Sequence, residues 1–167
     1  LAPMIANSIN EDKTIYKEIN YSKNDLKEIE LAAKLHDVGK ISVPEWVIDK
    51  STKLQKLIDG FELIKLRAEI IKRDLKIEFL ENKLTKESYD YNLQNIEDSL
   101  EFIRKANIGQ EFMSDADVKR VEEISLYKYY ENSIERNFLS DDEVYNISIR
   151  KGTLTKEEKD IMNSHAT

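Results

Sequence analysis

Two stretches of regularly spaced apolar residues constrain the fold of this 167-residue chain more than any other feature. In each, apolar residues recur at alternating steps of three and four, the spacing that places them on one face of a paired α-helix. The polar segment 82–87 between the stretches predicts a chain reversal, so we expect an antiparallel helical hairpin. Its first helix, about 28 residues long, would span about 42 Å. The two stripes comprise Leu54, Leu57, Phe61, Ile64, Ala68, Ile71 and Leu75, and then Tyr89, Leu93, Ile96, Leu100 and Ile103.

Capping residues and apolar periodicity predict further helices on both sides of this hairpin. One helix, already under way at Leu1, covers residues 1–9, a second ends at Gly39, and a third runs from Ser114 through Tyr129. No segment alternates apolar and polar residues with a period of two, so we predict an all-α protein with little or no sheet. The expected N-caps are Asn24, Ser114, Ser140 and Thr155, the last two in capping boxes with Glu143 and Glu158.

Composition narrows the classes of function. Lys and Arg number 26 against 33 Asp and Glu, which gives a net charge of −7. This acidic balance offers no positive field for phosphates, so we expect no DNA or RNA partner. The chain has no cysteine, which excludes disulfides and thiolate metal ligands. No apolar run approaches the roughly 18 residues of a membrane helix, so we expect no membrane insertion and a cytoplasmic location.

Residues 35–40, Leu-His-Asp-Val-Gly-Lys, hold the densest chemistry of the chain. His36 supplies a neutral ring nitrogen and Asp37 a carboxylate oxygen, and two such groups at the end of an apolar helix can bind one divalent ion. The alternative is a histidine at a helix end that bonds to a neighbouring carboxylate, with Gly39 and Lys40 as ordinary residues of a helix terminus.

The pattern continues beyond this hexapeptide. Val43-Pro44 and Lys50 follow it, residues 152–158 read Gly-Thr-Leu-Thr-Lys-Glu-Glu, and residues 161–165 read Ile-Met-Asn-Ser-His. Together these segments resemble the HD-GYP branch of the HD superfamily of metal-dependent phosphohydrolases. The resemblance covers residues 1–54 and 145–167, and it implies a fragment of an HD-domain helical bundle that the helical segment 55–144 interrupts as an insertion.

The resemblance also implies a site and an activity. It implies metal ligation by His36, Asp37 and His165, catalytic roles for Asp37 and Lys40, and divalent iron or manganese as the cofactor. The implied reaction is hydrolysis of a cyclic dinucleotide, cyclic di-GMP, by metal-activated water in bacterial signalling. Members of the family carry further ligands outside the matched segments, so this fragment is expected to hydrolyse its substrate weakly or not at all.

A second interpretation assigns no catalysis to the chain. It would be a regulatory or interaction module in which the hairpin binds a partner or forms a homodimer through heptad positions such as Phe61, Ile64, Leu93 and Ile96. The hairpin would otherwise pack on itself or on the rest of the chain. The set of metal ligands that the protein carries would distinguish the enzyme from the interaction module.

Overall fold

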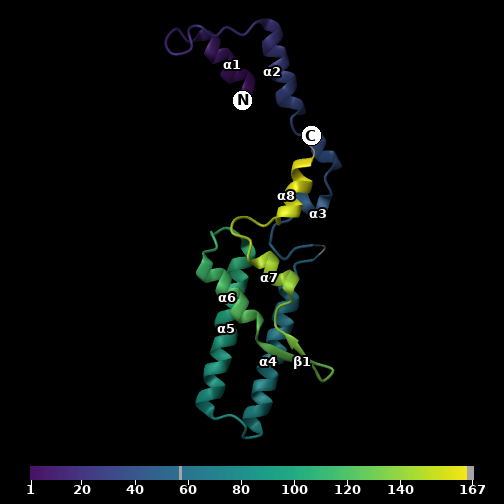
Figure 1. The fold of residues 1–167 in the computed structure, drawn as a ribbon. Coiled ribbons are helices and arrows are strands. Elements are labelled where there is room, and N and C mark those ends of the chain that lie inside the picture. The colour runs from purple at the N-terminus through teal and green to yellow at the C-terminus, as the bar shows by residue number, and fades with distance from the viewer. Residues whose placement is uncertain (57, 165–167) are drawn as a thin grey trace. The chain divides into compact units, whose positions relative to one another are not determined.

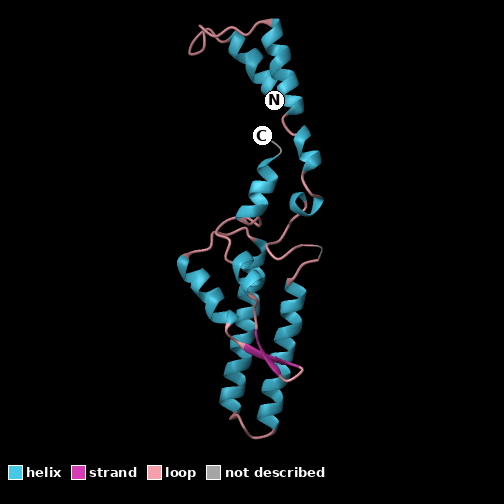
Figure 2. Cartoon of the chain, turned by 45° about the vertical axis from the view of Figure 1, so that its right-hand side comes forward, coloured by secondary structure: helices cyan, strands magenta, loops and turns pink. Residues whose placement is uncertain are grey.

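The computed structural model describes residues 1–56 and 58–164 and is predominantly helical (Figures 1 and 2). The predicted all-α class is confirmed, and the described residues form one small sheet, an antiparallel hairpin of two strands. The elements are α1 (Ala2–Glu11), α2 (Lys23–Leu35), the 3₁₀-helix η1 (Val38–Ser42), α3 (Glu45–Ile48), α4 (Phe61–Leu80), α5 (Lys86–Ile108), α6 (Asp115–Ser125), β1 (Lys128–Glu131), β2 (Ile134–Asn137), α7 (Asp141–Ile147) and α8 (Lys156–Asn163).

The chain divides into two compact units, Leu1–Glu45 with the residues from Asp160 onward, and Trp46–Lys159. In the first unit α1 packs against α2, and the Asn10 amide holds the loop between them. Its Nδ2 donates to the Tyr21 carbonyl at 2.9 Å and its Oδ1 accepts from the Tyr21 amide at 2.7 Å. The second unit contains the main hydrophobic core.

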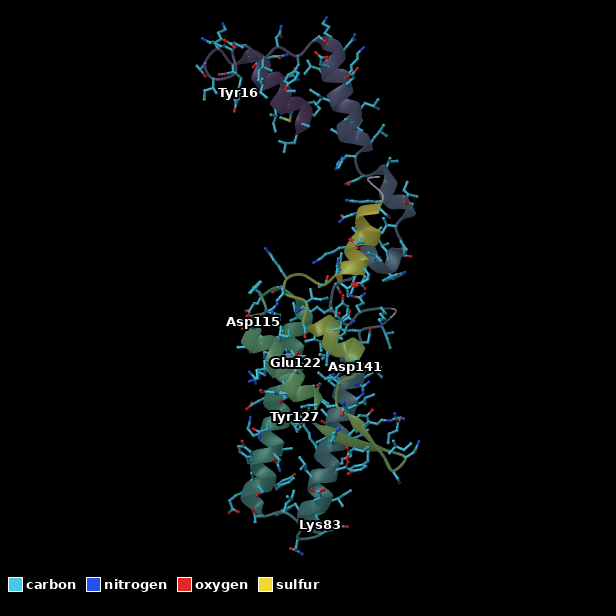
Figure 3. All side chains as sticks on the ribbon, in the orientation of Figure 1. Tyr16, Lys83, Asp115, Glu122, Tyr127 and Asp141 are labelled. Carbon is cyan, nitrogen blue, oxygen red and sulfur yellow. The ribbon has the colours of Figure 1, made fainter. Side chains whose placement is uncertain are left out.

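The predicted hairpin is present as α4 and α5, which lie side by side in the second unit (Figures 1 and 2). The Phe79 and Tyr89 rings stack with centroids 5.0 Å apart near the turn, where Lys83 is labelled in Figure 3. Both apolar stripes supply the core, as their spacing predicts. The buried stripe residues are Leu54, Ile64, Ala68, Ile71, Ile96 and Ile103.

The first helix of the hairpin is shorter than predicted, because it begins at Phe61 rather than near Leu54. Gly60 is its N-cap residue, and the Phe61 amide donates to the Asp59 carboxylate at 3.0 Å. The Gly60 amide in turn donates to the Leu54 carbonyl at 3.2 Å, which closes a loop where the heptad spacing predicts helix. Leu54 still reaches the core from this loop, at 7% exposure. Leu57, another predicted stripe residue, lies outside the described residues.

Three of the four predicted helix starts are confirmed, and one is wrong. Ser114 and Ser140 cap α6 and α7, and Thr155 forms a capping box with Glu158 at the start of α8. The cap of α2 is Ser22 rather than Asn24. The Ser22 hydroxyl accepts from the Asp25 amide, and the Asp25 carboxylate accepts from the Ser22 amide, a pair of bonds that Asn24 does not make.

The third predicted helix also ends early, at Ser125, and the chain then forms the β1–β2 hairpin. Asn132 and Ser133 both have positive φ, 51° and 66°, which is the geometry of a tight two-residue hairpin turn. The Phe138 amide donates to the Tyr127 carbonyl at 2.7 Å, and the Phe138 side chain is fully buried. Tertiary packing of Phe138 thus overrides the helical spacing that continues to Tyr129.

Candidate metal centre

His36 and Asp37 lie where α2 gives way to η1. The helix ends at Leu35 with His36 as its C-cap, so the predicted continuation to Gly39 is wrong. The His36 amide makes the last α-helical bond, to Ala32, and the next bond, from the Lys40 amide to the Asp37 carbonyl, has 3₁₀ spacing. The tighter turn brings the Lys40 side chain over Asp37 and leaves both residues of the His-Asp pair on the surface.

The His36 ring is held between two acceptors. Its Nδ1 lies 2.7 Å from the Ala33 carbonyl oxygen, and its Nε2 lies 3.2 Å from Oδ2 of Asp37. A carbonyl oxygen only accepts, so the Ala33 contact requires a proton on Nδ1. In the neutral ring, Nε2 then carries a lone pair, and this is the tautomer of a histidine that binds a metal through Nε2.

Two electron-rich atoms thus lie 3.2 Å apart at the centre of the predicted site. The carboxylate oxygen and the Nε2 lone pair repel each other unless a positive charge lies between them. A proton on Nε2 would make the two groups an ion pair, which is the case of a helix-end histidine bonded to its neighbouring carboxylate. A divalent cation would instead bind both groups as ligands. The His36 and Asp37 side chains are 68% and 49% exposed, so a cation can reach them from solvent.

Lys40 adds a positive charge on the other side of the Asp37 carboxylate. Its Nζ lies 2.8 Å from Oδ1 of Asp37, and its side chain is 44% exposed. The lysine therefore occupies one carboxylate oxygen and leaves Oδ2 to face His36. A lysine ammonium group is also a donor for phosphate oxygens.

The third predicted ligand, His165, lies outside the described residues. The helix that precedes it is present, since α8 begins after Thr155 and ends at Asn163. Among the described residues, 1–56 and 58–164, no three His, Asp or Glu side chains gather closely enough to hold a metal ion. His36 and Asp37 are thus the described part of the predicted ligand set.

Sequence reasoning missed a buried ion pair that joins the two segments of the motif. Lys50 follows the first segment and Glu158 belongs to the second, yet Nζ of Lys50 lies 2.8 and 2.7 Å from the two Glu158 carboxylate oxygens. The Lys50 side chain is fully buried, Glu158 is 10% exposed, and Asn146 accepts a further bond from the lysine at 3.3 Å. The capping box pointed to Glu158 as a helix cap, but no local signal connects it with Lys50.

A second buried lysine strengthens the same junction. Nζ of Lys53 donates to the carbonyls of Ile147 and Ile149, each at 2.8 Å, and the residue is 1% exposed. Burial lowers the pKa of Lys53 to about 8, because desolvation disfavours the ammonium form. The Thr153 hydroxyl also donates to the Lys50 carbonyl. Together these contacts bring residues 50–53 next to residues 146–158, so the segment between them begins and ends at the same place in the structure.

We predict that Lys53 makes the protein more stable as pH rises from 8 to 10. An unfolded lysine titrates near 10.4 whereas the folded pKa is about 8, so the unfolded state binds more protons in this window. The free energy of unfolding should therefore rise by about 2 kcal/mol relative to a Lys53→Met variant. Urea denaturation of both proteins at the two pH values measures this, and an equal pH response of the two would contradict it.

A pocket lies within the second unit, and its lining residues do not include His36 or Asp37. Its volume is about 570 Å³. Aromatic and acidic side chains dominate its lining, which comprises Trp46, Lys56, Asp142, Tyr145, Asn146, Thr155, Glu157 and Glu158. Several of these charges are already paired, since Lys56 contacts Asp142 at 2.9 Å and the Tyr145 hydroxyl donates to Glu157 at 2.9 Å.

Among the described residues, no helix is both long and apolar enough to cross a bilayer. Comparisons with protein-family models, with curated proteins and with solved structures found no match to this chain. A function for the chain therefore rests on its residue pattern and on the geometry of the His36–Asp37 pair.

Proposed function

We propose that this chain is part of a metal-dependent phosphohydrolase of the HD-GYP type that acts on cyclic di-GMP in the cytoplasm. The observation that carries the proposal is the 3.2 Å contact between Nε2 of His36 and Oδ2 of Asp37, with Nδ1 held by the Ala33 carbonyl. The contacts of Lys50 and Lys53 support it, because they join the two segments of the motif across the inserted residues.

Each residue of the pattern has a role in this proposal. His36 and Asp37 would hold divalent iron or manganese, and His165 would contribute a third ligand. The bound ion supplies Lewis-acid activation of water and neutralises charge on the phosphoryl group. Lys40 pairs with Oδ1 of Asp37 and offers its ammonium group to a phosphodiester oxygen.

Binding of cyclic di-GMP tests the proposed substrate. Titration calorimetry of the chain in manganese should detect binding of cyclic di-GMP, and removal of manganese by a chelator should abolish it. Lys40→Ala should weaken nucleotide binding about tenfold, since one charge-assisted contact to phosphate is lost. Manganese affinity should not fall in this variant, because Lys40 competes for Asp37 instead of holding the ion.

A matched variant controls for general loss of charge. Lys34→Ala removes an exposed ammonium from α2, which pairs with Glu30 at 2.6 Å, and it should leave nucleotide binding unchanged. Nucleotide binding that needs no manganese, or that Lys34→Ala and Lys40→Ala weaken equally, would contradict the proposed site.

A second candidate function is an interaction module that dimerises or binds a partner through the hairpin. Helices of 20 and 23 residues form the hairpin, and the predicted metal ligands lie outside it. Ile64 and Ile96, two of the predicted dimer positions, are 0% and 5% exposed and pack inside the chain. Any dimer or partner interface on the hairpin must therefore use other residues. Exposed apolar side chains on α4 favour the interaction module.

A further inference from the structure

The helix α4 carries a second apolar stripe in addition to the one buried in the core. Its positions recur at steps of three and four along most of the helix, with one arginine among the apolar residues. Four of its apolar side chains are exposed: Leu63, Leu66, Ile77 and Leu80 are 46%, 62%, 52% and 67% exposed, and Ile70 is half-buried. The complete stripe is Leu63, Leu66, Ile70, Arg73, Ile77 and Leu80.

We propose that this stripe, the α4 seam, joins two copies of the chain with their α4 helices antiparallel. This inference rests on the second candidate function, the interaction module, and is independent of the metal site. The seam suits a second copy because it complements itself: under a two-fold axis Leu63 faces the partner's Leu80 and Leu66 faces the partner's Ile77. From Leu63 to Leu80 the seam is about 26 Å long at 1.5 Å per residue.

Charges beside the seam select the antiparallel orientation. In a parallel pair, Arg73 would face the partner's Arg73, and Glu69 would lie beside the partner's Asp74, so like charges would meet on both sides of the two-fold axis. In the antiparallel pair, Arg73 faces the partner's Ile70, and Glu69 lies beside the partner's Lys76. The Glu69 side chain contacts Lys72 of its own helix at 3.3 Å but is 54% exposed, and Lys76 is exposed, so both groups can reach a partner helix.

Molar mass in solution tests the seam. Sedimentation equilibrium of the chain should give a dimer, and the double variant Leu66→Glu, Ile77→Glu should raise its dissociation constant by about a hundredfold or more, since acidic groups replace apolar contacts at facing positions. The matched double variant Tyr91→Glu, Leu126→Glu changes side chains that are 68% and 62% exposed elsewhere, and it should leave the dimer intact. Circular dichroism confirms that each variant is folded.

Charge reversal tests the orientation. Glu69→Lys should weaken the dimer about tenfold, because the introduced ammonium group would face the partner's Lys76, and adding Lys76→Glu should restore it. A parallel pair would respond in the opposite way, since Glu69→Lys would then face Asp74. A monomeric wild-type chain, or equal loss of the dimer in the matched double variant, overturns the seam. Tightening by Glu69→Lys overturns the antiparallel orientation and leaves the interaction module standing.

Discussion

Replacement of Glu158 by alanine is expected to lower the free energy of unfolding by about 3 to 5 kcal/mol. Glu158 is the carboxylate partner of Lys50, whose side chain is fully buried. Without it the ammonium group remains in the interior, and among the described residues it keeps Asn146 as a neutral acceptor. The variant also loses the carboxylate that accepts from the Thr155 amide at the start of α8. Urea denaturation followed by circular dichroism measures the change.

A double-mutant cycle separates the ion pair from the helix cap. Lys50→Met alone should also destabilise the protein, but Lys50→Met combined with Glu158→Gln should be less unstable than the sum of the two single changes by about 2 kcal/mol or more. The surface pair of Lys86 and Asp90, 3.0 Å apart, is the matched control. Asp90→Ala should cost far less than Glu158→Ala, because both members of this pair are exposed to solvent. Additive effects at Lys50 and Glu158 would show that the pair is not coupled.

Gly109→Ala is expected to destabilise the protein by about 3 kcal/mol, considerably more than Gly152→Ala. Both glycines have positive φ, 72° and 79°, so an alanine at either position is strained by its backbone conformation. Only at Gly109 would the new Cβ also meet other atoms, because it would lie 2.7 Å from the Gly152 carbonyl oxygen and 3.0 Å from the carbonyl carbon. A Cβ at Gly152 has no neighbour within 4 Å.

The comparison isolates the close approach from the backbone strain. Gly152→Ala should cost about 1 kcal/mol, which is the strain alone. The difference in the free energy of unfolding between the two variants therefore measures the effect of the close contact between Gly109, at the end of α5, and Gly152. Equal losses of stability in urea denaturation would mean that residues 109 and 152 are not in contact in solution.

Local patterns predicted the parts of the fold that depend on neighbouring residues. The heptad spacing located the hairpin, and the caps at Ser114, Ser140 and Thr155 were found because each capping bond spans three residues. The starts of α2 and α4 were missed because a competing local bond decides each of them: Asp25 with Ser22, and Asp59 with Phe61.

Contacts between distant residues explain what sequence reasoning missed. Phe138 is buried in a core to which α4, α5 and α6 all contribute, and this packing favours the β hairpin over a longer α6. Lys50 and Glu158 are separated by more than a hundred residues, and charged residue types are seldom fully buried, so their pairing has no local signature.

The part of the candidate site whose residues are close together in the sequence could be predicted. His36, Asp37 and Lys40 are close in sequence, and the structure links their polar groups by contacts of 3.2 and 2.8 Å, from His36 to Asp37 and from Asp37 to Lys40. The tautomer of His36 was not predictable, because it depends on the Ala33 carbonyl and on the end of α2 at Leu35. The role of His165 remains a prediction.

Metal content of the folded chain tests the central claim most directly. After incubation with manganese and removal of unbound ion, elemental analysis should find about one ion per chain in the wild type, and none in the double variant His36→Ala, Asp37→Ala. Glu28→Ala, which removes an exposed carboxylate from the same helix, should retain the ion. A wild-type chain that is folded and binds no metal, or a double variant that binds as much as the wild type, would contradict the proposed metal centre.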